Sequence, residues 1–356
     1  MSVTQRTVAI QQVQRILQGV RHRGRDATPL LQRAGIPPAL LQAPLARVSQ
    51  AQYALLIRVL RRSLRDELWG LCSQPLPVGS FGQCAAMLVR SRNLEEALRL
   101  GFRHYHGLLS DFVPRLVLQG DEARVQIIGR AAPNPRLDYA QKAFLLFAFG
   151  LASWLVARRV PVLAVDYTGP GQGSDSSRVY QAPIRYDEPH IGLRFEARWL
   201  ELPVVQNAQS LREFLAGAPA NLLIKYRDPT RVSERIRRLL RRRLDGELPS
   251  LEAVGEALAM APQTLRRRLR DEGHGFQALK DALRRDTAIE YLARPELTLL
   301  EIANQLGFSE ASTFHRAFKK WTGVAPGQYR LSRIAIAPAA ASSIPVIAAP
   351  AAIAIP

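Results

Sequence analysis

Cysteine is scarce in this sequence, with only Cys72 and Cys84 among 356 residues. Two thiols cannot form a framework of several disulfides or a four-cysteine zinc site, and so few cysteines are typical of a reducing compartment. The sequence also lacks a set of nucleophile, base and orienting residue that would indicate catalysis. We therefore expect no enzymatic activity, no cofactor and no metal.

A long uninterrupted apolar run is lacking as well. Residues 1–20 are polar and helical in pattern, without the apolar core of a signal peptide, so export is not expected. Residues 334–356 are uncharged and long enough to cross a bilayer, but a proline every five to seven residues prevents a continuous helix. We predict a disordered tail rich in Ala, Pro and Ile over 333–356, and a cytoplasmic protein that does not enter a membrane.

Acidic residues are the minority among the charged residues. Asp and Glu number 30 against 49 Lys and Arg, for a net charge of +19. This excess favours a polyanionic partner, and the 47% hydrophobic content indicates a folded chain. Residues 225–333 carry a net +8 and residues 1–224 a net +11. Because the excess covers both parts, charge alone leaves two alternatives open, which are sequence-specific DNA binding and nonspecific or architectural DNA binding.

The apolar periodicity changes twice along the chain. The first 120 residues have mainly the three- and four-residue spacing of helices, and β-branched runs appear after them. The expected elements are helices in 29–42, 49–64 and 91–109, a hairpin in 111–130, a helix in 138–159 and strands in 161–169 and 184–200. From residue 225 the pattern is helical only. We predict a multidomain protein, with a mixed α/β effector domain over 1–224 and an all-α domain over 225–332.

A repeat lies inside the all-α domain. Residues 251–273 align with residues 299–323, and both segments read as a helix, a short turn and a second helix. A small residue, Gly255 in the first copy and Ala303 in the second, allows the two helices to cross closely. Gly307 can adopt the left-handed conformation that ends a helix. The two copies therefore predict two helix-turn-helix modules.

The second helix of each copy has an apolar face and a polar face. At 100° per residue, Leu265 and Leu269 share one face of the first copy, and Phe314 and Phe318 share one face of the second. The opposite faces carry Gln263, Arg266, Arg267 and Arg270 in the first copy, and Ser312, Thr313, Arg316, Lys319 and Lys320 in the second. A helix fits the major groove, where arginine can donate two hydrogen bonds to guanine, whereas the two lysines are placed for phosphates.

Residues 228–330 resemble the DNA-binding domain of the bacterial arabinose-regulator (AraC-type) family of transcription factors. The matching residues are Ala303, Gly307, Phe308, Phe314, Arg316, Phe318, Gly323, Pro326, Tyr329 and Arg330. The resemblance implies seven helices that hold two helix-turn-helix modules, with promoter DNA and RNA polymerase as partners. By position, the base-contacting residues of the family fall at Gln263, Arg266 and Arg267 in the first module and at Ala311, Ser312, Thr313 and Arg316 in the second.

Residues 1–220 resemble the effector domain of the family branch that includes ornithine-utilisation regulators. The matching segments are 30–42, 80–111 and 180–204. This resemblance implies a mixed α/β domain that binds a small-molecule effector and mediates formation of a homodimer. It does not identify the effector.

Three residues are candidates for the effector site: Phe81, His104 and His106. Phe81 belongs to segment 74–82, whose prolines and glycines are expected to form a turn that lines a pocket. His104 and His106 are two residues apart on an expected helix, so their side chains diverge, which weighs against a metal site. Two interpretations of these histidines stay open, the polar edge of an effector pocket or the surface of a helix end.

Overall fold

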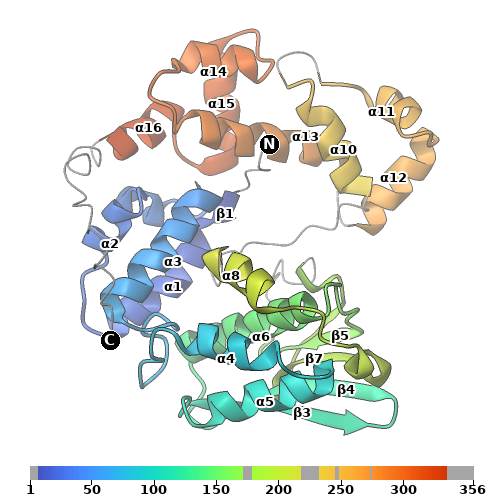
Figure 1. Cartoon of the computed structure of the whole chain (residues 1–356). Coiled ribbons are helices and arrows are strands. Elements are labelled where there is room, and N and C mark those ends of the chain that lie inside the picture. Colours follow the sequence, from blue (N-terminus) through green and yellow to red (C-terminus); the bar gives the residue numbers. More distant parts are fainter. Residues whose placement is uncertain (1–6, 171–178, 218–231, 245–247, 273–274, 335–356) are drawn as a thin grey trace, which may run out of the picture.

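The computed structural model describes residues 7–170, 179–217, 232–244, 248–272 and 275–334. The described chain forms a mixed α/β part up to residue 217 and a helical part from residue 232, which occupy separate halves of Figure 1. This confirms the fold class expected from the sequence. The domain boundary expected near residue 224 and residues 335–356 of the expected tail lie outside the described residues.

A two-stranded antiparallel ribbon and three α-helices begin the described chain. These elements are β1 (Thr7–Ala9), α1 (Ile10–His22), α2 (Thr28–Arg33), the 3-10 helix η1 (Pro38–Gln42), β2 (Arg47–Ser49) and α3 (Gln50–Leu64). Val8 pairs with Val48 across the ribbon. The helical pattern expected from residue 1 is therefore wrong for β1, because pairing with a strand distant in the sequence leaves no trace in local periodicity.

A five-stranded sheet follows. Its strands are β3 (Phe112–Gln119), β4 (Glu122–Gly129), β5 (Ala164–Asp166), β6 (Ile184–Arg185) and β7 (Ile191–Glu196), in the order β3-β4-β7-β5-β6. All neighbours are antiparallel except β5 and β6. Gly120 has a φ of 58° in the turn between β3 and β4, as the hairpin expected in 111–130 requires.

Four α-helices and one 3-10 helix accompany the sheet. They are α4 (Ser80–Leu88), α5 (Leu94–His106), α6 (Pro135–Leu155), η2 (Ala197–Glu201) and α8 (Ala208–Gly217). The Asn134 side chain accepts a hydrogen bond from the Leu137 N–H, and Pro135 occupies the first turn, so α6 begins where its sequence directs. Helix α6 contacts α1, α5 and β7, and thus joins the N-terminal helices to the sheet.

The helical part consists of seven described helices. They are α10 (Val232–Arg241), α11 (Leu251–Ala257), α12 (Pro262–Asp271), α13 (Phe276–Tyr291), α14 (Leu299–Gln305), α15 (Ala311–Thr322) and α16 (Pro326–Ile334). Their buried side chains fall into two clusters. The cluster around α10 to α12 is separate, whereas the cluster around α14 to α16 is continuous with the core of the α/β part. Helix α13 contacts both α10 and α15, and its buried residues divide between the two clusters.

Candidate nucleic-acid interface and effector cavity

Helices α11 and α12 form the first helix-turn-helix module. Leu265 and Leu269 of α12 are buried, so they fix the helix against its neighbours. A Cβ atom added at Gly255 would lie 2.7 Å from the Met260 carbonyl oxygen, closer than real Cβ contacts. Ala259, in the turn, has a φ of 52°. Glycine at position 255 therefore lets the chain after α11 turn back tightly against the helix.

Helices α14 and α15 form the second module. Thr298 and Glu301 make the capping box that the sequence predicts at the start of α14. Gly307 ends the turn after α14 with a φ of 72°, which confirms the left-handed conformation expected there. Phe314 and Phe318 are buried in the core of the module. The apolar face of α15 is thus used for packing and its opposite face is left for solvent.

The polar faces of α12 and α15 point outward. Eight of the nine predicted DNA-contacting residues are exposed: Gln263, Arg266, Arg267, Arg270, Ser312, Thr313, Arg316 and Lys319. The ninth, Ala311, is half-buried at the first position of α15 and packs against the module core. Each module therefore presents a polar and basic helix face beside an apolar, buried one.

Most of these cations are not neutralised within the chain. Among the described residues, none forms an ion pair or a hydrogen bond with the side chain of Arg267, Arg270, Arg316 or Lys319. Arg266 lies 3.8 Å from a carboxylate oxygen of Glu252, but both side chains are more than 60% exposed, so this pair is weak. The two helix faces thus keep positive charge available for an anionic partner.

The α/β part encloses an apolar cavity between α4, α5, α6 and the loop that follows α3. Its volume is about 40 Å³, enough for about three water molecules. Most of its lining side chains are aliphatic or aromatic, and Phe81, Phe144 and Phe147 are among them. Glu67 and Tyr105 are the lining residues with a carboxylate and a hydroxyl group. The lining makes this a candidate site for a mainly apolar small molecule, for which the cavity would have to expand, because ligand sites usually measure about 300–1,000 Å³.

Comparison with known proteins identifies both parts of the chain. Residues 24–204, half of the sequence, match the family model described as the arabinose-binding N-terminal domain of AraC transcription regulators. Residues 254–332 match the model of a helix-turn-helix domain. The chain belongs to the AraC family of transcription regulators. It is a sequence-specific DNA-binding regulator with an N-terminal effector domain and a C-terminal helix-turn-helix domain.

The curated relatives of this AraC-family protein are transcription regulators. It is 26% identical to the ornithine utilization regulator of Pseudomonas aeruginosa over 333 residues, which cover 93% of this chain and 98% of the relative. It is 28% identical to the regulator VqsM of the same species, over 72% of this chain and 81% of the relative. The crystal structure of the regulator CdpR from Pseudomonas aeruginosa matches 90% of this chain and 98% of its own, with 19% identity and a TM-score of 0.29.

The three effector-site candidates of this AraC-family protein do not all lie at the cavity. Phe81 lines the cavity, whereas His104 and His106 are not among its lining residues. His104 stacks edge-on against Tyr105 at 5.2 Å, and the exposed His106 ring nitrogen lies 2.8 Å from the Pro114 carbonyl oxygen. In the described part of the chain, no group of His, Cys, Asp and Glu could hold a metal ion. No described helix is both long and apolar enough to cross a bilayer.

The two helices that flank the second module of the AraC-family chain, α13 and α16, are hydrogen-bonded to the N-terminal ribbon. The Thr7 hydroxyl donates a hydrogen bond to the Asp286 carboxylate of α13 at 2.6 Å. The Tyr329 hydroxyl of α16 donates to the backbone carbonyl of Arg47 at 2.7 Å, although the Tyr329 ring is fully buried in the module. One helix-turn-helix module is therefore tied to the effector domain, and the other has a core of its own.

Sequence reasoning missed Glu67, Thr7 and Arg47. Glu67 lies between Asp66 and an apolar run, where an acidic residue in a turn is ordinarily exposed, yet it is only 4% exposed. Its burial depends on the start of α4, which packs against it from further along the chain. Thr7 and Arg47 contact residues almost 300 positions away, and no local pattern announces such a contact.

Proposed function

We propose that the exposed faces of α12 and α15 bind two successive major-groove segments of one promoter site. The proposed contact residues are Gln263, Arg266, Arg267, Arg270, Ala311, Ser312, Thr313, Arg316 and Lys319. The observation that carries this proposal is the pair of matching modules, each with exposed cations that no described side chain neutralises. Such cations bind phosphates and base edges without first breaking an internal ion pair.

Distinct roles follow from position on each helix. Arg267 and Arg316 lie centrally on the exposed faces, where a guanidinium can donate two hydrogen bonds to guanine. Arg270 and Lys319 lie further along their helices and would neutralise phosphates. Ala311 offers only a half-buried methyl group, which suits contact with a thymine methyl group. Helix α13 contacts α15 of the second module and α10, which in turn contacts α12 of the first, and so would hold the two helices at the spacing of about 34 Å between successive major grooves.

The remaining parts of the proposal concern regulation. We assign effector sensing to residues 1–224, with the effector in the apolar cavity, and DNA binding to residues 225–332. A homodimer through the N-terminal domain, contact with RNA polymerase and a cytoplasmic location complete the proposed function. The family to which the chain belongs and the cavity of the α/β part support this assignment.

The proposal is tested by selecting a binding site from random DNA and mapping the protection that the full-length protein gives on it. We expect protection of two adjacent major grooves on one face of the duplex for each chain. Protection of a single groove would refute the arrangement of the two modules. Equal affinity for the selected site and for random DNA at 150 mM salt would instead favour an architectural DNA-binding protein.

A further inference from the structure

Glu67 is a buried carboxylate for which the described chain supplies no cation. Its two oxygens accept hydrogen bonds from the backbone N–H groups of Gly79, at 2.9 Å, and Phe81, at 2.8 Å. Each oxygen accepts one backbone hydrogen bond and, in an ionised carboxylate, keeps a lone pair for a further donor. No described residue forms an ion pair with Glu67. A buried charge without a counter-charge is costly, so a cationic ligand at this position would gain a strong interaction.

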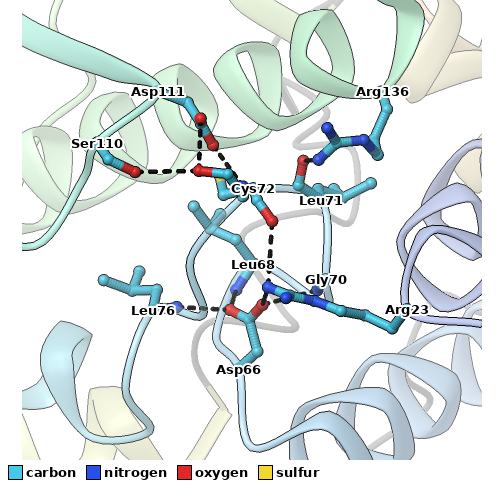
Figure 2. Close-up of polar contacts among 11 residues, drawn as sticks. Arg23, Asp66, Leu68, Gly70, Leu71, Cys72, Leu76, Ser110, Asp111 and Arg136 are labelled. Atoms are coloured by element: carbon cyan, nitrogen blue, oxygen red, sulfur yellow. Dashed lines mark hydrogen bonds and ion pairs between the residues drawn. The ribbon is translucent and has the colours of Figure 1, made fainter. Parts of the chain in front are cut away.

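Two arginines contact the loop that carries Glu67 at groups other than Glu67, as Figure 2 shows. The Arg23 guanidinium lies 4.0 Å from the Asp66 carboxylate and donates a hydrogen bond to the Cys72 carbonyl. Arg136 donates to the Leu71 carbonyl. Arg23 therefore approaches Asp66, the neighbour of Glu67 in the sequence.

The loop that carries Glu67 is held rigidly. The Asp66 carboxylate accepts hydrogen bonds from three backbone N–H groups of the loop, those of Leu68, Gly70 and Leu76, at 2.8 to 2.9 Å (Figure 2). The Glu67 backbone N–H donates to the Leu76 carbonyl at 2.9 Å. The Glu67 backbone is thus fixed at one wall of the cavity, and the residue is preorganised for binding.

The other residues that line the cavity indicate the chemical character of the rest of the ligand. Aromatic rings of Phe102, Phe144 and Phe147 contribute apolar surface, which also attracts an ammonium group through the ring faces. Burial raises the pKa of the Tyr105 hydroxyl well above its ordinary value and raises the pKa of the Cys84 thiol to about 12, so both groups stay neutral. None of the described residues that line the cavity is Lys, Arg or His. An anionic ligand would therefore meet Glu67 with no compensating cation.

We propose that the effector cavity takes an amphipathic amine, with an apolar body among the aromatic rings and an ammonium group paired with Glu67. The Tyr105 hydroxyl, for which the described residues show no hydrogen bond, would accept a second hydrogen bond from the ammonium group. This inference rests on the proposed effector site and adds the chemical class of its ligand. It excludes fatty acids and other anionic apolar molecules as the preferred class.

A cavity of about 40 Å³ must widen to hold such a ligand, and one of its wall residues, Phe81, lies near α8. The Phe214 ring of α8 lies 6.2 Å from the Phe81 ring of the cavity wall and stacks on Trp154 at 4.3 Å. Helix α8 is the last described element before the DNA-binding half. A ligand that displaces Phe81 would therefore alter the packing of α8.

The test compares three probes of equal chain length, which are octylamine, octanol and octanoate, by calorimetric titration of the full-length protein. We expect octylamine to bind about tenfold more tightly than octanol, since a charged hydrogen-bonded pair is added, and octanoate to bind most weakly. In Glu67→Gln, the amine and the alcohol should bind alike. Equal affinity of amine and alcohol in the unaltered protein, tightest binding of octanoate, or no binding of any probe would overturn the proposal.

Two matched substitutions of alanine by leucine locate the site independently of Glu67, in case Glu67→Gln fails to fold. Ala148→Leu on α6 fills the cavity and should weaken octylamine at least tenfold. Ala86→Leu, on the exposed side of α4, should leave its affinity unchanged. Equal loss in both variants would contradict binding in the cavity. DNA binding is measured on the same samples, so a wrong ligand class with an intact footprint is distinguishable from failure of the proposed function.

Discussion

At the scale of single residues, the phase of a side chain on its helix decides its role. Leu265 is buried and Arg266, the next residue, is exposed, and the same change separates Phe318 from Lys319. The helical wheel predicts this division from the sequence, because each helix has one apolar stripe. Burial of Glu67 has no such periodic signal and is evident only in the folded chain.

Gly255→Ala should destabilise the protein although alanine is the better helix former. The added Cβ would lie 2.7 Å from the Met260 carbonyl oxygen, and a backbone atom can move aside only with the whole turn. We expect a loss of about 1–3 kcal/mol in the free energy of unfolding, measured with urea. Gly327→Ala is the control, because a Cβ at that position meets no atom within 4 Å. A neutral Gly255→Ala would show that the turn is looser than described.

At the scale of elements, local signals predict the two modules well. The capping box of α14, the glycine after it and the apolar stripe of α15 all lie within some twenty-five residues of one another. The ribbon of β1 and β2 and the cavity were not predictable in this way, since both depend on segments that meet only after folding. Their sequences are short and have no distinctive period.

Thr298→Ala and Ser250→Ala compare the caps of the two equivalent helices. Thr298 and Glu301 exchange hydrogen bonds in both directions at the start of α14, whereas Ser250 accepts one from the Ala253 N–H at the start of α11 without a capping box. Both changes should destabilise by about 0.5–2 kcal/mol, and Thr298→Ala more than Ser250→Ala. Hydrogen exchange of the α14 and α11 amides measures each effect locally. The opposite order would contradict the reciprocal cap of α14.

At the scale of the whole molecule, the two helix-turn-helix modules differ in how they pack against the α/β part. The second module shares a continuous core with the α/β part, and the first has its own. A family resemblance predicted the order of the domains and the kind of each. It could not predict this asymmetry, because contacts such as the one between Thr7 and Asp286 depend on individual side chains far apart in the sequence.

Tyr329→Phe tests the docking of the second module. The change keeps the buried ring and removes the hydroxyl that donates to the Arg47 carbonyl at 2.7 Å. We expect a loss of about 0.5–1.5 kcal/mol and faster hydrogen exchange in β2 and α13. Tyr291→Phe on α13 is the control, since the described residues show no hydrogen bond of its hydroxyl. Unchanged exchange in β2 with Tyr329→Phe would show that the docking contact contributes nothing.

The central claim is that exposed side chains of α12 and α15 select a DNA sequence, and one titration tests it most directly. Affinities of the unaltered protein, Arg316→Ala and Lys319→Ala are measured for the selected site and for random DNA at several salt concentrations. Arg316→Ala should cost about 1–3 kcal/mol on the selected site and reduce its preference over random DNA, while Lys319→Ala should weaken both DNAs evenly and reduce the salt dependence. Equal loss on both DNAs with Arg316→Ala would contradict the account.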